Sequence, residues 1–278
     1  MKTYSTFAIA LFCLVSAVAQ PLQKVIFYPD NPALKQEWNF NPDGLLSDIR
    51  NADGEIMRDF TYDGNHNMTV MNVYIEIWNE FPPTLTYTYD ANNHITTMNG
   101  ASYSYENATN SYLFGDLSDS YKRCYLTSEG LLKNEELHYY DLDLEQYVTD
   151  SGVSCGYVNG NLTVTYNTES FMSNFTIMSW QHVTVTNPLK AAMMPVLKAL
   201  AIYSFNSSHN KWAYADYCSD HLPVTLRYDI SDPESSDYLH ELNAAGLPVK
   251  TIRKDYYLGQ YEGQSVSALY YYQGDVIP

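Results

Sequence analysis

Two short motifs in the sequence contain residue types that could support catalysis or metal binding. Residues 152–156, Gly-Val-Ser-Cys-Gly, match Gly-x-Ser-x-Gly, which activates a serine when a strand precedes it and a helix follows. The next residues instead flank Asn159-Gly160 with apolar runs, which predicts a hairpin. His240-Glu241 begins like a His-Glu-x-x-His zinc motif, but Leu-Asn-Ala follows and the second histidine is missing. We therefore assign no catalytic residue, no metal ligand and no cofactor.

Acidic residues could support hydrolysis or bind a cation. Asp141, Asp143 and Glu145 would share one face if their segment were a strand, but Gln146 replaces the glycine that a calcium loop needs. We predict a solvated edge strand here, and an exposed acidic loop over residues 232–237. Glycoside hydrolysis needs two carboxyl groups about 5–10 Å apart across a cleft. A secreted, glycan-active hydrolase therefore stays an alternative, although no motif selects a pair.

Aromatic residues offer a different chemistry, because 27 of the 278 residues are tyrosines. Tyr74 and Trp78 lie on one face of an alternating run, and Trp180 lies in another such run. Flat rings on a sheet can stack on sugars while nearby acids bind the hydroxyl groups, or they can fill cross-strand pairs in the core. We predict Trp78, Tyr74 and Trp180 as ligand-binding residues, with a carbohydrate or another envelope polymer as the partner.

The charge and the first residues indicate where the protein works. Fifteen basic side chains against 32 acidic ones give a net charge of −17, which disfavours nucleic acid and anionic lipid as partners. Lys2, the apolar run 7–18 and Ala17-Val-Ala19 are typical of a signal peptide cleaved after Ala19. We predict export to the periplasm, the cell surface or the medium. No later segment is apolar over the roughly 20 residues of a membrane helix.

Three cysteines follow the signal peptide. Cys124, Cys155 and Cys218 form an odd number in an oxidising compartment, without zinc-ligand spacing. One disulfide with one free thiol and three buried thiols are both compatible with the sequence.

Most of residues 20–278 alternates between apolar or aromatic and polar residues, as in the runs 71–79, 85–89, 162–166, 183–186 and 224–228. This period of two predicts a half-buried antiparallel sheet. Asn187-Pro188 followed by an apolar segment predicts one helix near 188–200, with Pro195 ending or kinking it after about two turns. No linker divides the chain, so we expect a single β-rich domain.

The predicted turns repeat a pattern in which an aromatic residue precedes Asp or Asn, a Gly or Asn follows three residues later, and an apolar residue begins the next strand. The clearest copies begin at Phe40, Tyr62 and Tyr89, and looser copies begin at Tyr125 and Leu242. This pattern resembles the YD-repeat, or RHS-type, hairpin. The whole chain resembles a group of secreted bacterial proteins of unknown function that use such hairpins. The resemblance implies a large antiparallel sheet that is porin-like or barrel-like.

We therefore predict an all-β protein whose antiparallel meander is curved or closed and contains one short helix. We expect a non-enzymatic binding or structural role in the cell envelope. The glycan-active hydrolase and an outer-membrane β-barrel are the alternatives. The second would need a continuous apolar outer band with aromatic girdles, whereas many outward positions are Thr, Asp or Asn.

Overall fold

The computed structural model describes residues 20–75, 82–115, 120–141, 143–167, 175–202, 217–228 and 234–277. Nineteen strands and one helix lie in these residues. The first ten strands are β1 Leu22–Phe27, β2 Gln36–Phe40, β3 Leu46–Arg50, β4 Ile56–Tyr62, β5 Met68–Val73, β6 Thr84–Tyr89, β7 Ile95–Met98, β8 Ala101–Ser102, β9 Ser104–Glu106 and β10 Ser111–Gly115. The others are β11 Ser120–Leu126, β12 Leu132–Asp141, β13 Gln146–Val158, β14 Asn161–Asn167, β15 Phe175–Thr186, α1 Pro188–Leu200, β16 His221–Tyr228, β17 Glu234–Leu242, β18 Pro248–Tyr257 and β19 Gln260–Tyr272.

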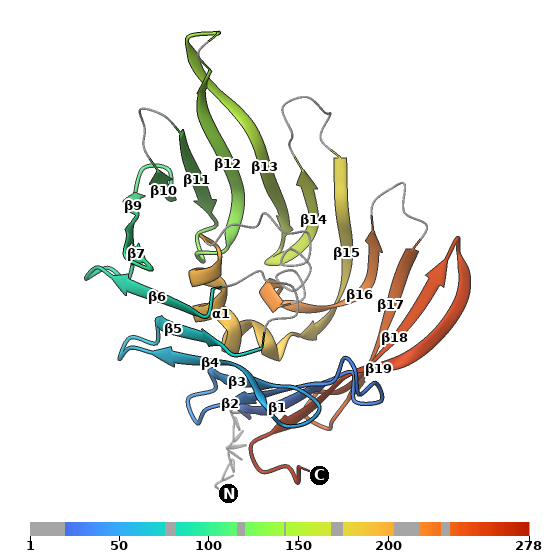
Figure 1. The fold of residues 1–278 in the computed structure, drawn as a ribbon. Helices are drawn as coiled ribbons and strands as arrows, with labels where there is room; N and C mark the ends of the chain where they lie inside the picture. Colours follow the sequence, from blue (N-terminus) through green and yellow to red (C-terminus); the bar gives the residue numbers. More distant parts are fainter. Residues whose placement is uncertain are drawn as a thin grey trace, which may run out of the picture.

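The strands form one antiparallel ring (Figure 1). Successive strands pair with each other around the ring. The short strands β8 and β9 flank Tyr103, whose N–H donates to the carbonyl of Thr96 in β7. The first strand pairs with both β2 and the last strand β19, so the ladder returns to its start. The predicted curved or closed meander is confirmed, and closure protects strand edges that would otherwise invite aggregation.

Alternation along the strands points one set of side chains into the ring. Leu85 and Tyr87 in β6, and Met71 and Val73 in β5, are all less than 9% exposed, in agreement with the predicted period of two. Helix α1 lies inside the ring and packs against β1 and β5 (Figure 1). Its buried residues are Leu189, Ala192, Met193, Val196, Leu197 and Ala199. The core is therefore built between an internal helix and the inner face of the sheet.

Helix α1 begins as predicted. The side chain of Asn187 accepts a hydrogen bond from the N–H of Leu189, and Pro188 occupies the first helical position. The helix covers Pro188–Leu200, which confirms the predicted range 188–200, and it does not end at Pro195, the first of the two effects expected of that proline. Proline removes one hydrogen bond to the residue four positions earlier, Ala191. Because Ala191 is exposed, water can satisfy that carbonyl, and the buried apolar residues on both sides of Pro195 hold the helix together.

Six hairpin turns share one geometry. In each, the N–H of the first residue donates to the carbonyl of the fifth, and the N–H of the fourth donates to the carbonyl of the first. The fourth residue is left-handed, with φ from 64 to 86°, which explains Gly, Asn or His there. The side chain of the first residue accepts a hydrogen bond from the N–H of the fifth in every copy. The turns are 41–45, 51–55, 63–67, 90–94, 127–131 and 243–247.

Five tyrosine hydroxyls bind the residue that directly follows a turn of this kind. The pairs, with oxygen to backbone distances of 2.6–2.9 Å, are Tyr62 with Leu46, Tyr89 with Met68, Tyr112 with Ile95, Tyr157 with Leu132 and Tyr272 with Pro248. Burial raises the pKa of Tyr112 to about 12 and raises those of Tyr62, Tyr89 and Tyr272 further. Part of the tyrosine excess therefore links five of these six hairpins to another strand.

We expect Tyr89→Phe to lower the free energy of unfolding by about 1–2 kcal/mol, because the buried carbonyl of Met68 loses its donor. Urea unfolding followed by circular dichroism measures the change. Tyr261→Phe is the control, since Tyr261 is 55% exposed, and it should change stability by less than about 0.5 kcal/mol. Equal stability of the Tyr89 and Tyr261 variants would show that the tyrosine hydroxyls do not stabilise the ring.

Residues 143–145 form a turn between β12 and β13, and the predicted edge strand was wrong. β12 ends at Asp141, whose carboxylate accepts hydrogen bonds from the N–H groups of Asp143 and Leu144. Asp141 satisfies the turn with its own side chain, which makes a bend more favourable than a continued strand. Asp143 and Glu145 are exposed, so solvent separates the three charges as expected.

Candidate functional site

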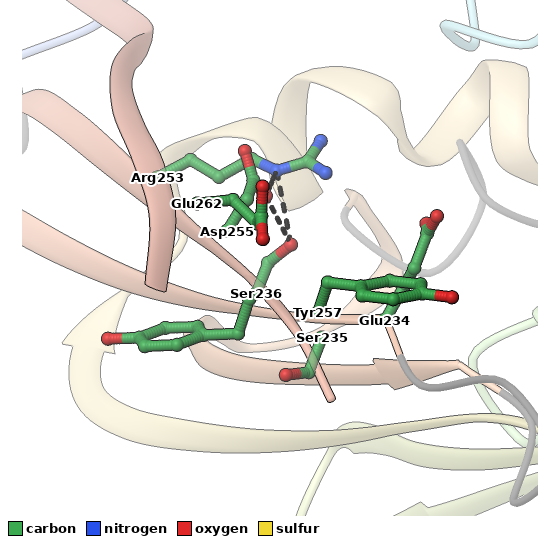
Figure 2. Close-up of a pocket in the computed structure, with 8 residues that line it drawn as sticks. Glu234, Ser235, Ser236, Arg253, Asp255, Tyr257 and Glu262 are labelled. Carbon is green, nitrogen blue, oxygen red and sulfur yellow. Dashed lines mark hydrogen bonds and ion pairs between the residues drawn. The ribbon is translucent and has the colours of Figure 1, made fainter. Parts of the chain in front are cut away.

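A cavity of about 300 Å³ lies where β17, β18 and β19 approach the hairpin at 258–259 (Figure 2). Alternation along β18 places Arg253 and Asp255 on the same inner face as Thr251, which is 4% exposed. The volume is at the lower end of the range for small-molecule sites. The described lining residues are Glu234, Ser235, Ser236, Arg253, Asp255, Tyr256, Tyr257 and Glu262.

Three side chains form a fixed base for this cavity. Arg253 Nε lies 2.5 Å from Asp255 Oδ1 and 3.1 Å from Ser236 Oγ. The hydroxyl of Ser236 donates to the same carboxylate oxygen at 2.8 Å, and Ser236 is only 1% exposed. Ser236 and Asp255 face each other across β17 and β18, so the register brings them together. Because the contacts are mutual, the guanidinium and the carboxylate are oriented before any ligand binds.

The rest of the lining is acidic and aromatic. Glu234 and Glu262 are exposed, and Tyr257 is 48% exposed. Tyr256 makes an edge-to-face contact with Tyr261, with ring centroids 5.9 Å apart. The cavity thus combines one guanidinium with three carboxylates, two serine hydroxyls and tyrosine rings. Such a set can bind hydroxyl groups and stack on a ring.

Tyr74 and Trp180, two of the three predicted ligand-binding residues, do not line the cavity. Tyr74 is 61% exposed just after β5, and its hydroxyl donates to Asp59 at 2.8 Å. Trp78 lies outside the described residues. Trp180 in β15 is 4% exposed and belongs to the core cluster, where its ring is covered by protein. Among the predicted three, Tyr74 therefore presents a ring to solvent.

The sequence motifs have structural explanations. Residues 152–156 lie within strand β13, with no helix after them, so the nucleophile elbow is absent. Ser154 donates to Asn134 Oδ1 at 2.8 Å instead. His240 lies in β17, and its side chain contacts both neighbouring strands. Its Nε2 is 2.8 Å from the carbonyl of Pro223 in β16, and its Nδ1 is 2.9 Å from the Thr251 hydroxyl in β18. In the described part of the chain, no three His, Cys, Asp or Glu side chains converge as a metal site.

The setting of His240 predicts a pH effect on stability. Burial lowers the pKa of His240, opposed by its hydrogen bond to the Pro223 carbonyl, so the fold favours the neutral ring. Its contribution is complete above the unfolded pKa of about 6.5 and is lost as the pH falls through the lower folded value. The free energy of unfolding of the wild type, measured in urea, should fall from pH 7 to pH 5, and that of His240→Gln should fall less. His66→Asn, in a surface turn, is the control. If the free energy of unfolding of His240→Gln depended on pH as strongly as that of the wild type and of His66→Asn, the prediction would be contradicted.

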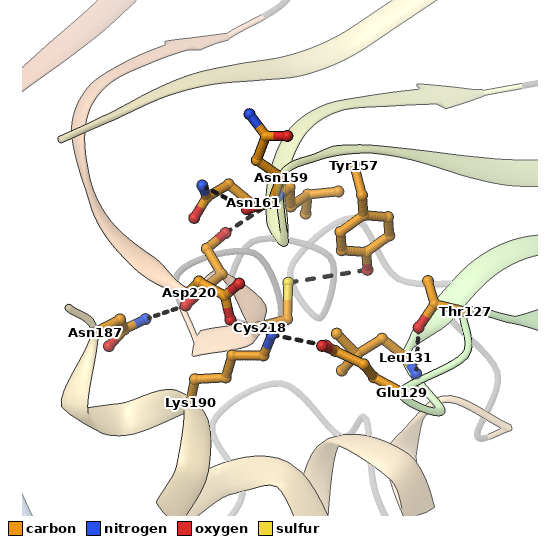
Figure 3. Close-up of polar contacts among 12 residues, drawn as sticks. Thr127, Glu129, Leu131, Tyr157, Asn159, Asn161, Asn187, Lys190, Cys218 and Asp220 are labelled. Carbon is orange, nitrogen blue, oxygen red and sulfur yellow. Dashed lines mark hydrogen bonds and ion pairs between the residues drawn. The ribbon is translucent and has the colours of Figure 1, made fainter. Parts of the chain in front are cut away.

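Polar contacts fix α1 at the end of the ring that carries the tyrosine links (Figure 3). Lys190 Nζ lies 2.6 Å from Asp220 Oδ1 and 2.7 Å from Glu129 Oε2 in the turn 127–131. Burial lowers the pKa of Lys190, but the two carboxylates outweigh this and raise it overall. The N–H of Asp220 donates to the carbonyl of Gly160, where a Cβ atom would lie 1.7 Å from the Asp220 carboxylate. The helix is thus attached to two hairpin turns.

The outer face carries polar rows. Asn39, Asp48, Asp59, Asn72 and Thr84 lie opposite one another across β2 to β6. The side-chain amides of Asn39 and Asn72 donate to Asp48 and Asp59 at 2.8 and 2.9 Å. These residues alternate with buried inner residues such as those of β5 and β6, so the row points away from α1. We call this set the outer polar row.

Cys124, Cys155 and Cys218 form no disulfide with one another. Cys124 and Cys218 are buried, and Cys155 is half-buried. Burial raises the pKa of the Cys124 thiol to about 12, so this thiol stays protonated and unreactive. The sequence is compatible with one disulfide or with none, and the structure has none among these three cysteines.

The sequence interpretation missed the base of the cavity. Residues 232–237 were expected to form an exposed acidic loop, but Glu234–Asp237 begin β17 and bury Ser236. The spacing of Arg253 and Asp255 places both on one face of a strand, which was an available signal. Their proximity to Ser236 depends on strand register, which no local pattern contains.

No helix in the described residues is long and apolar enough to cross a membrane. No protein-family model matches the chain. No curated protein is similar to it. Several solved structures match the chain, two of them porin-like proteins. A porin-like protein from Bacteroides uniformis aligns over 91% of this chain and 97% of its own, with 10% identity and a TM-score of 0.37. A porin-like protein from Bacteroides vulgatus aligns over 69% and 94%, with 11% identity and a TM-score of 0.25.

Proposed function

We propose that this chain is an exported, water-facing barrel with a non-enzymatic binding role in the cell envelope, and that its ligand is a carbohydrate or another envelope polymer. The outer polar row is the observation that carries the proposal. A lipid-facing strand position should be apolar, and a charged side chain such as Asp48 or Asp59 there would destabilise a membrane barrel by an amount that depends on its depth.

Charged pairs elsewhere on the outer face support the same proposal. Lys24 lies 2.9 Å from Glu37, and Lys250 lies 3.0 Å from Glu241. Lys24 and Glu37 alternate with the buried Val25 and Trp38, so both point outward. A continuous apolar band, which the outer-membrane alternative needs, is incompatible with these positions.

The inside of the ring supports binding rather than conduction. Helix α1 occupies it, and six of its side chains are buried. Lys122 and Glu135 also point inward and form a 3.1 Å ion pair whose side chains are 14% and 10% exposed. A ligand would then bind at the surface or in the cavity of β17–β19, where the exposed Tyr257 lies with the carboxylates of Glu234 and Glu262.

Two measurements test the proposal on the chain from Gln20 to Pro278. The protein should stay monodisperse in light scattering without detergent and should not change the conductance of a planar bilayer. A glycan array with bacterial envelope polysaccharides should give specific signals. Aggregation without detergent together with channel currents would establish the outer-membrane alternative. Release of reducing ends from a bound glycan would establish the hydrolase alternative.

A further inference from the structure

The cavity of β17–β19 contains more negative than positive charge. Its described lining has three carboxylates, from Glu234, Asp255 and Glu262, and one guanidinium, from Arg253. Asp255 already forms an ion pair with Arg253. The whole chain adds a net charge of −17, so the potential around the cavity favours cations and repels phosphate or uronic acids.

The tyrosines at this cavity fit a cation as well as a sugar ring. The face of a tyrosine ring attracts an ammonium group within about 6 Å, and the same face stacks on the apolar side of a pyranose. Tyr257 is 48% exposed, so about half of its surface is accessible to a ligand. The ring lies beside the exposed Glu234 (Figure 2), and Tyr257 and Glu234 are partners across β18 and β17.

The base of the cavity supplies orientation. The Arg253–Asp255–Ser236 contacts hold one carboxylate and one guanidinium at fixed positions, which suits neighbouring hydroxyl groups of a sugar. Ser236 is 1% exposed, so the protein holds its hydroxyl against the Asp255 carboxylate. A volume of about 300 Å³ limits the ligand to a small unit, such as one ring with its substituents.

We propose that this cavity binds an amino sugar unit of a glycan, with its protonated amine near Glu234 and Glu262 and its ring against Tyr257. The inference rests on the proposed carbohydrate-binding function and names its site and the chemical class of its ligand. The amine supplies the positive charge that the lining favours, and the hydroxyl groups use the fixed base.

Isothermal titration at about pH 5.5 with a glucosamine tetramer and an N-acetylglucosamine tetramer tests the role of charge, since acetylation turns each positive amine into a neutral amide that carries an acetyl group. We expect the free amine form to bind at least tenfold more tightly, with an affinity that falls as salt is added. The double variant Glu234→Gln/Glu262→Gln should bind the glucosamine tetramer three- to tenfold more weakly than the wild type. Glu241→Gln, an exposed acid of β17 outside the cavity, is the matched control and should have no effect.

The outcomes separate this inference from the proposed function. If the acetylated tetramer binds equally well and the glutamine variants are unaffected, the amine assignment is overturned while carbohydrate binding stands. If spermidine binds as tightly as the glucosamine tetramer, the sugar ring is not recognised and the assignment is also overturned. If neither tetramer binds and the glycan array gives no signal, the carbohydrate function fails as well. Thermal melting of each variant shows whether the fold is retained.

Discussion

Trp180→Ala is expected to lower the free energy of unfolding by about 3–5 kcal/mol, because it removes a large ring from the core. Trp180 is 4% exposed and lies opposite Leu226, which is 5% exposed, across β15 and β16. Both strands are enclosed by neighbours in the ring, so the backbone cannot collapse into the space that the ring leaves. Urea unfolding at 25 °C, followed by far-ultraviolet circular dichroism, measures the loss.

Trp180→Phe separates packing from polar effects. The Trp180 indole N–H is buried and has no hydrogen-bond partner in the structure, so its removal costs no hydrogen bond. The Phe variant should therefore lose much less than the Ala variant and should bind glycans as the wild type does. A folded Trp180→Phe protein that had lost glycan binding would restore the sequence-based assignment of Trp180 as a ligand contact.

Leu197→Ala is expected to lower the free energy of unfolding by about 2–5 kcal/mol. Leu197 is 2% exposed and lies on the side of α1 that packs in the core cluster with strand residues such as Met71. Alanine preserves the helix and removes only the apolar contacts, so the measured loss reports how strongly the helix is packed inside the ring.

Ala191→Ser provides the control on the same helix. Ala191 is exposed, so its replacement should change stability by less than about 0.5 kcal/mol. Both variants are compared in urea with the wild type. If Leu197→Ala matched Ala191→Ser, the helix would not contribute to the core, and the support that an occupied ring gives to the proposed function would be lost.

Local chemistry in the sequence predicted most of the elements. Alternation identified β6 and β14, and the N-cap Asn187 with Pro188 located the start of α1. Turn residues located the hairpins because a left-handed fourth residue restricts the side chain, as at Gly130 and Gly246. These features act over a few residues, so a single sequence is enough to reveal them.

Long-range features could not be predicted in the same way. The pairing of β1 with β19 joins the two ends of the chain, and alternation is equally compatible with an open sheet. The cavity depends on the register between β17 and β18, and Trp180 has the same alternating pattern whether its face is covered or exposed. YD-repeat kinship, the signal peptide and the carbohydrate ligand stay predictions.

The pairing of the first strand with the last has a consequence for the order of folding in time. Leu22 lies opposite Tyr272, so the ring cannot close until almost the entire chain has been made. Hairpins such as the one around 63–67 need only neighbouring residues and can form early, whereas closure needs a contact across the whole sequence and is slow. Until then β1 and β19 both have unpaired edges. The interval before closure is therefore when the chain is most exposed to aggregation, and when a chaperone would protect it.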